Sequence, residues 1–323
     1  MRQLVLKEPG RFAIEEAPEP VPRAGEALLR ARRVGVCGTD YHAYEGKQPY
    51  FTYPRILGHE LAVEVVEAPA NEFGIRAGDR CAVEPYLSCG ACHACRIGKP
   101  NCCERIQVLG VHTDGGMREL FAVPLDRLHR SESLTFDQLV LVEPFGIGAH
   151  AVQRSQLKPG EEVLVVGAGP IGLAITQFAR AAGGRVRVLE INPARRSFAE
   201  RLGVEILAEP DEELSEVVFD ATGSVAAMEK SFERVAHGGR LVFVSVVQSA
   251  VRFDDPLFNR REMTLLSSRN SVGEFPPILR MIEDGRIETA PWITHRLSMD
   301  DVPRRFPDLP REKNCIKAVV EVV

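Results

Sequence analysis

The pattern of hydrophobic and polar residues divides the chain into two kinds of segment. Near the N-terminus, short β-type runs such as residues 27–34, 61–66 and 80–83 are broken by Gly, Pro and Asp. Such runs predict short strands joined by turns, and helical periodicity is scarce among them. Runs of the same type return after residue 291 and end with residues 316–322. We therefore expect the two ends of the chain to fold together in one β-rich domain.

The middle of the chain, from about residue 149, alternates apolar strands with helices. One of these helices has a proline in its first turn, where the missing N–H is tolerated. Alternation of this kind predicts a parallel sheet covered on both faces. The expected strands are residues 162–166, 185–189, 204–207, 216–219, 240–246 and 263–267, and the expected helices are residues 171–182 and 193–202.

Only residues 208–215 separate the third and fourth of these strands. A crossover between parallel strands normally needs about ten or more residues with its helix. We therefore expect a truncated helix or a single turn in this segment. The change of pattern places the β-rich domain in residues 1–148 and 291–323, and the α/β domain in residues 149–290.

Composition limits the classes of function. The chain of 323 residues is 45% hydrophobic and 26% charged, and its net charge is −5. Nothing in this balance favours nucleic acid or an anionic membrane as a partner. The N-terminal segment has too short an apolar run for a secretory signal, and the sequence has no run of about 18 apolar residues to span a bilayer. We expect a cytoplasmic protein that acts on a small molecule.

A glycine-rich turn joins the first strand of the expected parallel sheet to its helix. The turn reads Gly167-Ala168-Gly169-Pro170-Ile171-Gly172. In a dinucleotide-binding turn of this form, the first glycine makes the tight turn and the second lets the pyrophosphate approach the backbone. The third glycine lets helix and strand pack closely, and the helix that begins with Pro170 and Ile171 offers the free N–H groups of its first turn to the phosphates.

The acid at the end of the next strand, Glu190, indicates which dinucleotide this turn would bind. A carboxylate there can accept hydrogen bonds from the adenosine ribose and repels a 2′-phosphate, which favours NAD over NADP. Arg195 and Arg196 keep NADP open, because either guanidinium can meet a phosphate. The alternative for the whole motif is a glycine turn made only for packing.

Four cysteines lie close together in one loop-like stretch with the spacing C-x2-C-x2-C-x7-C. Four thiolates can close a tetrahedral cage around one Zn²⁺ and leave no open position, which predicts a structural zinc. The chain holds eight cysteines and no secretory signal, so metal binding is favoured over a disulfide cluster or a redox sensor. Cys102 can take the place of its neighbour as the fourth ligand. The four cysteines are Cys89, Cys92, Cys95 and Cys103.

A second set of possible ligands lies outside this loop: Cys37, His59, Glu60 and Glu143. Catalytic zinc sites characteristically take three protein ligands and keep a fourth position for water or substrate. Each of these residues taken alone can be purely structural. Together, and beside a dinucleotide turn, they predict a catalytic zinc centre. Asp40 is expected either in a turn or orienting one of the ligands.

These motifs resemble the zinc-containing medium-chain alcohol/polyol dehydrogenases, and they do so over essentially the whole chain. The resemblance implies a GroES-like β-rich catalytic domain and a Rossmann domain with a doubly wound parallel sheet. It implies that Cys37 and His59 bind the catalytic zinc, and that Glu60 and Glu143 either ligate the metal or hold its water. The segments that carry the resemblance are Gly35-Val36-Cys37-Gly38-Thr39-Asp40, Gly58-His59-Glu60, the four cysteines, Glu143-Pro144 and the glycine turn.

The same resemblance implies a reaction and a path for its proton. Thr39 matches the family's relay hydroxyl, and His42 matches a relay histidine at the solvent end, with a surface histidine as the alternative. Arg195 matches an arginine beside the adenosine. Glutamate at position 143 resembles the sorbitol, threonine and sugar-acid branches, which favours a polyhydroxylated substrate. We therefore expect reversible oxidation of a secondary alcohol to a ketone with NAD, by a homodimer or homotetramer.

Two other classes of function remain open. A zinc-independent quinone or enoyl reductase of the same fold needs no metal ligands, so Cys37, His59 and Glu143 disfavour it. A non-catalytic cofactor-binding protein would keep the fold without its chemistry. Two zinc ions per chain would support the dehydrogenase, and one would support either alternative.

Overall fold

The computed structural model describes residues 1–49, 51–210 and 212–322. The chain folds as two compact units. Unit 1 is formed by Met1–Glu143 together with Phe275–Val323, and unit 2 is formed by Pro144–Glu274. In the described parts of the chain, no helix combines the length and the apolar character that a bilayer crossing requires.

The boundaries of the units differ from those expected at 148/149 and 290/291, and the main difference is helix α9 (Phe275–Glu283). This helix belongs with unit 1 because it packs on strand β10 (Leu128–Ser131). The Phe275 ring lies 4.9 Å from the His129 ring, and Glu283 accepts a hydrogen bond of 2.6 Å from Ser131. These contacts join residues far apart in sequence, so the local pattern did not reveal them.

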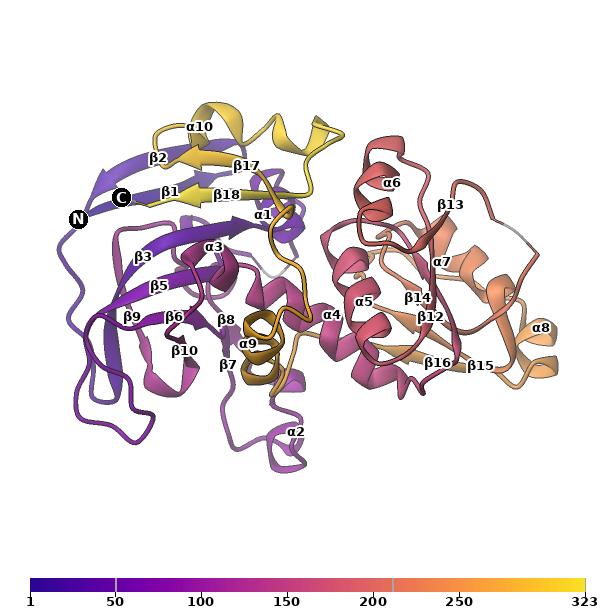
Figure 1. Cartoon of the computed structure of the whole chain (residues 1–323). Coiled ribbons are helices and arrows are strands. Elements are labelled where there is room, and N and C mark those ends of the chain that lie inside the picture. Colours follow the sequence, from indigo (N-terminus) through magenta and orange to yellow (C-terminus); the bar gives the residue numbers. More distant parts are fainter. Residues whose placement is uncertain (50, 211, 323) are drawn as a thin grey trace. The chain divides into compact units, whose positions relative to one another are not determined.

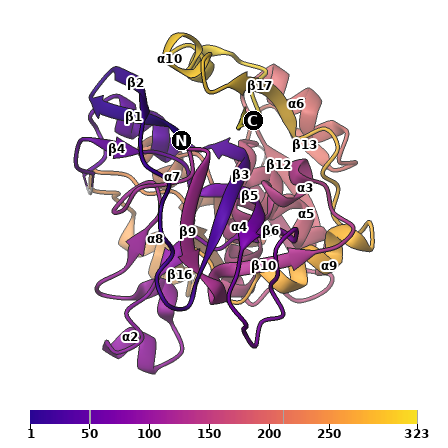
Figure 2. The same ribbon diagram turned by 90° about the vertical axis from the view of Figure 1, so that its left-hand side faces the viewer.

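Unit 1 is built mainly from antiparallel strands (Figure 2). Its largest sheet has the order β10-β6-β5-β3-β18-β17, and β9 pairs with the first part of β3. The return of the C-terminal strands to this sheet agrees with the expectation that both chain ends fold together. The strands are β3 (Glu26–Val36), β5 (Glu60–Glu67), β6 (Arg80–Val83), β9 (Leu120–Pro124), β17 (Ile293–Ser298) and β18 (Lys317–Glu321).

The register of three neighbouring strands brings distant residues to one edge of this sheet. Gly35, near the end of β3, pairs with Glu60, the first residue of β5. On its other side β3 pairs with β18, with Val36 opposite Ala318. The ends of β3, β5 and β18 therefore meet directly before Cys37.

A second sheet and a short ladder complete the strands of unit 1. The second sheet has the order β2-β1-β4, and the ladder pairs β7 with β8. Side chains of the second sheet share a buried core with those of the large sheet. In this core Leu4, Leu61, Phe121 and Phe306 are almost fully buried. Burying each such side chain contributes about 1.5–3 kcal/mol. The strands are β1 (Arg2–Glu8), β2 (Arg11–Glu16), β4 (Arg55–Ile56), β7 (Tyr86–Leu87) and β8 (Gln107–Val108).

The helices that belong wholly to unit 1 are short and lie between the strands. In Figures 1 and 2, α2 stands apart from the sheets of this unit, in the stretch that holds the four clustered cysteines. Besides α9, they are α1 (Gly38–Tyr44), α2 (His93–Arg96), α3 (Phe136–Leu139), α10 (Val302–Arg305) and the 3₁₀ turns Pro100–Cys102, Leu125–Arg127 and Leu309–Arg311.

Unit 2 holds a parallel sheet with the strand order β13-β12-β11-β14-β15-β16 (Figure 1). Numbered from the first strand of the unit, this is the order 3-2-1-4-5-6 of a doubly wound dinucleotide-binding sheet. The expected alternation of strand and helix is present. The strands are β11 (Glu162–Val166), β12 (Arg185–Leu189), β13 (Glu205–Leu207), β14 (Ser215–Asp220), β15 (Val235–Phe243) and β16 (Thr264–Ser267).

The helices of unit 2 cover its sheet. Helix α5 contacts β11 and β12, α6 contacts β13, and α7 contacts β14 and β15. Helix α4 begins at Val142, so the chain passes from unit 1 to unit 2 within its first turn. The helices are α4 (Val142–Ser155), α5 (Pro170–Ala181), α6 (Pro193–Glu200), α7 (Val225–Ser231), α8 (Asp255–Arg260) and the 3₁₀ turn Phe232–Arg234.

The segment between β13 and β14 differs from expectation. Its described residues, 208–210 and 212–214, form neither helix nor hydrogen-bonded turn, and residue 211 lies outside the described residues. The segment must cross β12 and β11, a distance of about 14 Å, and also return along the sheet by roughly 10–15 Å. Seven extended residues span at most about 25 Å. So short a connection leaves no room for the expected truncated helix, and residues 208, 209 and 212 bend without forming one.

Candidate metal centre and cofactor site

Three of the predicted ligands meet at the sheet edge where β3 ends and β5 and β18 begin. Cys37 follows β3, His59 precedes β5 and Glu60 begins it. One ligand atom of each lies within 4.8 Å of the other two, and His59 and Glu60 are buried. Sulfur, nitrogen and oxygen donors at this spacing can share one metal ion.

The backbone before His59 is held by close packing at Gly58. Its φ is +99°, and a Cβ there would lie 2.5 Å from a methyl carbon of Val34. Backbone atoms of Gly58 would in turn meet a Cβ built on Gly110 or on Gly115 at less than 3 Å. Only glycines allow these strands and turns to approach so closely, and this packing fixes where His59 enters the site.

Asp40 connects Cys37 to His59. Its Oδ2 accepts a hydrogen bond of 2.9 Å from the backbone N–H of Cys37, and its Oδ1 lies 3.8 Å from Nδ1 of His59. Oδ1 of Asp40 and Nδ1 of His59 are both buried, and neither makes a hydrogen bond to any described residue. Burial raises the pKa of the Asp40 carboxyl. A carboxylate beside the imidazole in this way can orient a metal-binding histidine.

Glu60 is paired with a lysine that sequence reasoning missed. Lys317, the first residue of β18, donates to Oε1 and Oε2 of Glu60 at 2.6 and 2.7 Å, and to the carbonyl of Val36 at 3.2 Å. Burial lowers the pKa of Lys317, but the negative charge of Glu60 opposes this effect. The net shift of the Lys317 pKa is upward. The Glu60 carboxylate is thus neutralised in place.

Glu143 lies near this group but outside its 4.8 Å limit, at the start of α4. Its Oε1 accepts a hydrogen bond from the hydroxyl of Tyr86 in β7. Burial raises the pKa of Glu143 to about 7, although the His59 ring lowers it. Tyr86 is the second site residue that no sequence motif indicated.

The surroundings of the Cys37 thiol are rich in acids. For His59, burial lowers the pKa, but Cys37 and Asp40 raise it by more, so the net shift is well upward. A site in which negative groups outweigh the cost of burying a positive charge suits a divalent cation. The donor set and this field both fit zinc.

Helix α1 holds the two predicted proton-relay residues. Thr39 is half-buried and His42 is exposed, and they lie three positions apart on the helix. Residues at this spacing share one face of a helix, so the pair runs from the side of Cys37 outward to solvent. Their role in moving a proton stays a prediction.

The four predicted cysteines of the loop converge. The Sγ atoms of Cys89, Cys92, Cys95 and Cys103 all lie within 4.8 Å of one another, whereas Cys102 is exposed and outside this group. Backbone N–H groups of Ala91 and Cys92 lower the pKa of Cys89 to about 5. N–H donors of this kind favour the thiolate, which is the form that binds a metal.

The glycine turn follows β11 and opens α5, as predicted. Gly167 has a φ of +97°, and a Cβ on Gly172 would lie 1.8 Å from the carbonyl oxygen of Gly167. These two glycines are required by the backbone itself. A Cβ on Gly169 would meet only Nη1 of Arg195, at 3.9 Å. The space beside Gly169 is therefore open to a ligand at the N-terminus of α5, where Pro170 has no N–H and the N–H of Ile171 lies in the first turn.

Glu190 ties the glycine turn to the end of β12. It is buried, with Oε2 accepting from the N–H of Ala168 and Oε1 from that of Asn192, each at 2.7 Å. Each carboxylate oxygen has a second lone pair that can accept from a ribose hydroxyl. Arg196 donates to the carbonyls of Glu190 and Ile191, so it is occupied by the backbone. Arg195 instead reaches toward Gly169, and its buried Nε makes no hydrogen bond to the described residues.

Comparisons with known proteins identify the family. A model described as an alcohol dehydrogenase GroES-like domain matches residues 23–133, and one described as a zinc-binding dehydrogenase matches residues 170–284. The chain is 38% identical to L-galactonate-5-dehydrogenase of Escherichia coli K12, covering 99% of this chain and 98% of that protein. The chain belongs to the zinc-type polyol dehydrogenase family. It is also 32% identical to D-altritol 5-dehydrogenase of Agrobacterium fabrum, covering 98% of each.

A solved structure supports the same family and the predicted fold class. The RspB alcohol dehydrogenase of Escherichia coli CFT073, complexed with NADH, matches with a TM-score of 0.93 and 28% identity. The match covers 100% of this chain and 99% of that one. A GroES-like domain with a Rossmann sheet is therefore confirmed for this zinc-type dehydrogenase, and NAD(P) is its class of cofactor.

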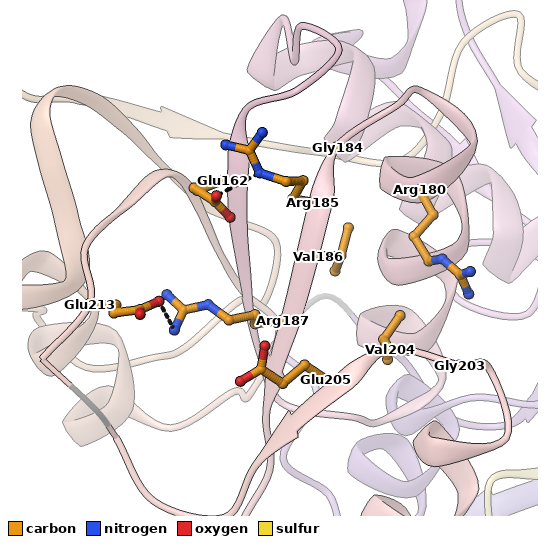
Figure 3. Close-up of a pocket in the computed structure, with 10 residues that line it drawn as sticks. All are labelled: Glu162, Arg180, Gly184, Arg185, Val186, Arg187, Gly203, Val204, Glu205 and Glu213. Carbon is orange, nitrogen blue, oxygen red and sulfur yellow. Dashed lines mark hydrogen bonds and ion pairs between the residues drawn. The ribbon is translucent and has the colours of Figure 1, made fainter.

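This zinc-type dehydrogenase also has a cavity of about 480 Å³ away from the glycine turn, at the amino ends of β11, β12 and β13 (Figure 3). Its arginines are already engaged. Arg185 pairs with Glu162 at 2.6 Å, and Arg187 pairs with Glu213 at 2.7 Å. None of the predicted site residues is among the described residues that line this cavity. The arginines and glutamates of its lining are equal in number, so their charges cancel.

The two residues that sequence reasoning missed in this zinc-type dehydrogenase differ in how visible they were. Lys317 is a lone cation in the apolar run of residues 316–322, and a buried charge in a strand signals a partner. Tyr86 sits between a strand and the cysteine loop, where an aromatic residue carries no special signal.

Proposed function

We propose that this chain oxidises a secondary alcohol of a small polyhydroxylated substrate to a ketone, with NAD as the hydride acceptor. The observation that carries the proposal is that Cys37 lies within 4.8 Å of the buried side chains of His59 and Glu60. Glu143 lies beside this group. Their sulfur, nitrogen and oxygen donors are those of a catalytic zinc site.

The residues that would hold the catalytic zinc are Cys37, His59 and one or both of the glutamates. Zinc bound there acts as a Lewis acid toward the substrate hydroxyl. Asp40 orients Cys37 and His59 through the contacts described above. Lys317 keeps the second acid, Glu60, from adding an uncompensated charge to the buried site.

Thr39 and His42 are the proposed route for the proton. In the oxidation, the carbinol C–H bond breaks and its hydride goes to the nicotinamide ring of NAD, while the hydroxyl proton must leave toward solvent. Thr39 accepts that proton at its hydroxyl as it passes its own proton on, and His42, one turn away on the exposed side of α1, accepts the proton and releases it to solvent. His42→Ala should slow proton release when the buffer is dilute. Added imidazole should restore the rate of proton release.

The glycine turn, Glu190 and Arg195 are the proposed cofactor contacts. The open space beside Gly169 suits a pyrophosphate on the N-terminus of α5, and Glu190 suits a ribose with free hydroxyls. Arg195 is placed to meet a phosphate of the cofactor. Steady-state kinetics with both cofactors test the preference: a lower KM for NAD supports it, and equal or better use of NADP overturns it.

The substrate class is proposed from the relatives. The relatives compared above are named for L-galactonate and D-altritol, a sugar acid and a polyol. A screen of polyols, aldonates and amino alcohols for NADH production tests the class. Turnover of sugar acids or polyols supports the proposal, and turnover of simple alcohols alone contradicts it.

A second zinc is proposed for the cysteine loop, where Cys89, Cys92, Cys95 and Cys103 would enclose it as a structural ion. Metal analysis should find two zinc ions per chain. One ion would favour a zinc-independent reductase or a non-catalytic protein of this fold. We also propose assembly as a homodimer or homotetramer, which light scattering after size-exclusion chromatography tests directly.

A further inference from the structure

We propose that Tyr86 is a positioning residue for Glu143, whose carboxylate it holds by one oxygen so that the other faces the Cys37–His59 site. The idea rests on the proposed function, because it assumes that a metal ion occupies that site. It adds a residue that lies outside every motif identified in the sequence.

The contact itself is specific. The Tyr86 hydroxyl donates to Oε1 of Glu143, and each residue is 5% exposed. A buried carboxylate must find partners within the protein, since water cannot supply them. A phenol is neutral near pH 7, so it fixes the carboxylate without cancelling its charge. Oε2 is then the oxygen left to face a metal ion or its bound water.

The backbone of Tyr86 is held in place on both sides. In the β7–β8 ladder, Tyr86 pairs with Val108. Arg127 donates to the carbonyl of Tyr86 at 3.1 Å, and Leu109 donates to that of Pro85 at 3.1 Å. A side chain on so constrained a backbone loses little entropy when it holds a partner, which is what a positioning residue needs.

The two acids near Cys37 therefore have different partners. Glu60 is held at both oxygens by a cation, Lys317, which compensates its charge. Glu143 is held at one oxygen by a neutral donor, Tyr86, which adds no compensating positive charge. The geometry points to Glu143 as the acid whose orientation is set for the metal site, and to Tyr86 as the residue that sets it.

Tyr86→Phe in the full chain tests this role, because it removes one hydroxyl and keeps the ring. Two properties of the Cys37–His59 metal site are measured: its zinc affinity, by chelator competition, and the absorption spectrum of Co²⁺ substituted there. Cys37→Ala, which should remove this site, shows which signals belong to it. Removing a partner that orients a metal ligand typically weakens metal binding by about 10–100-fold. We expect a loss of that size with altered Co²⁺ bands, and a fall in kcat larger than any change in KM.

Two comparisons separate positioning from general damage. In a Glu143→Gln background, Tyr86→Phe should change metal affinity by less than about twofold, since the acid it orients is gone. Tyr53→Phe is the matched control: its hydroxyl bonds to the carbonyl of Ala43 in the same unit, and its loss should leave metal affinity unchanged. Fluorescence of Trp292, the only tryptophan and fully buried, checks that each variant is folded.

The inference is overturned if folded Tyr86→Phe binds zinc within about twofold of the parent with unchanged Co²⁺ bands, or if the loss is as large in the Glu143→Gln background. A Tyr86→Phe chain that does not fold would also contradict it, because a positioning hydroxyl is not required for folding. Failure of the proposed function looks different, since Cys37→Ala would then leave the zinc content unchanged.

Discussion

Lys317 donates hydrogen bonds to both carboxylate oxygens of Glu60, at 2.6 and 2.7 Å, across 257 positions of the chain. The pair is 3% and 1% exposed, and it joins the first residue of β18 to the first residue of β5. The C-terminal strand thus completes the electrostatics of a site whose proposed ligands come from the N-terminal half.

Lys317→Ala should destabilise unit 1 strongly. It leaves the buried Glu60 carboxylate without its cation, and breaking a buried pair from one side costs about 3–5 kcal/mol. Urea unfolding followed by Trp292 fluorescence measures the change. Lys47→Ala, which removes an exposed pair with Glu45, is the control and should cost about 1 kcal/mol or less. Equal losses for the two variants would mean that the Glu60 pair has no special weight.

Replacing each of two glycines of the dinucleotide turn with alanine should affect a different property: stability in one case and NADH binding in the other. Gly172→Ala forces a Cβ to within 1.8 Å of the Gly167 carbonyl oxygen, so unit 2 should lose several kcal/mol of stability. Gly169→Ala meets only the end of Arg195 at 3.9 Å, so the fold should keep its stability while NADH binding weakens by tenfold or more.

Thermal unfolding and NADH fluorescence titration, run on both glycine variants, separate the two effects. Unchanged NADH affinity in folded Gly169→Ala would argue against a pyrophosphate at that position.

An ion network on unit 1 gives a pH-dependent prediction. Hydrogen bonds from Arg296, and a further one from Arg33, lower the pKa of Asp137 although burial opposes them. Its contribution to stability is therefore complete above the unfolded pKa of about 3.9, and disappears as pH falls through the lower folded value. Because the group is partly exposed and screened, Asp137→Asn should cost only about 0.5–1 kcal/mol.

Urea unfolding of Asp137→Asn and the parent, from pH 7 down to pH 3, tests this sign. The difference should be constant above about pH 5 and shrink below pH 4. Asp308→Asn, which removes a more exposed carboxylate 3.6 Å from Arg311, should show little effect at any pH. A difference that grows toward acid would contradict the assignment.

The cysteine loop should depend on its metal for order. Cys95→Ser removes one of four proposed ligands, so one zinc ion should be lost and trypsin should cleave after Arg96, which lies in α2. Cys102→Ser changes an exposed thiol outside the group and should retain the ion and resist trypsin. Mass spectrometry of the digests reads both outcomes. Resistance of metal-depleted Cys95→Ser would show that the loop is ordered by packing alone.

Parts of the fold and the site could be predicted from sequence because they depend on local pattern. The glycine turn and the cysteine spacing are each contained in one short segment, and each strand or helix of residues 162–267 has its own local pattern. The structure follows these patterns closely. Cys37 and His59 could be paired because each stands in a distinctive motif. Residues of this kind are recognisable before any strand register is known.

Other parts could not be predicted because they depend on which strands become neighbours. Lys317 meets Glu60 only through the pairing of β18 with β3, and Tyr86 meets Glu143 only through the placing of β7 near the start of α4. Helix α9 groups with unit 1 through Phe275 and Glu283. The described residues between β13 and β14 form no helix, because this short segment must cross the sheet. No local periodicity encodes these long-range relations.

The most direct measurement of the central claim is the zinc content and turnover of Cys37→Ala, beside Cys102→Ala as control. We predict that Cys37→Ala retains one zinc ion per chain, bound by the cysteine loop, and loses all detectable oxidation of polyols or sugar acids. Cys102→Ala should retain two ions and full turnover. A folded Cys37→Ala chain that still holds two zinc ions, or still turns over substrate, would contradict the account.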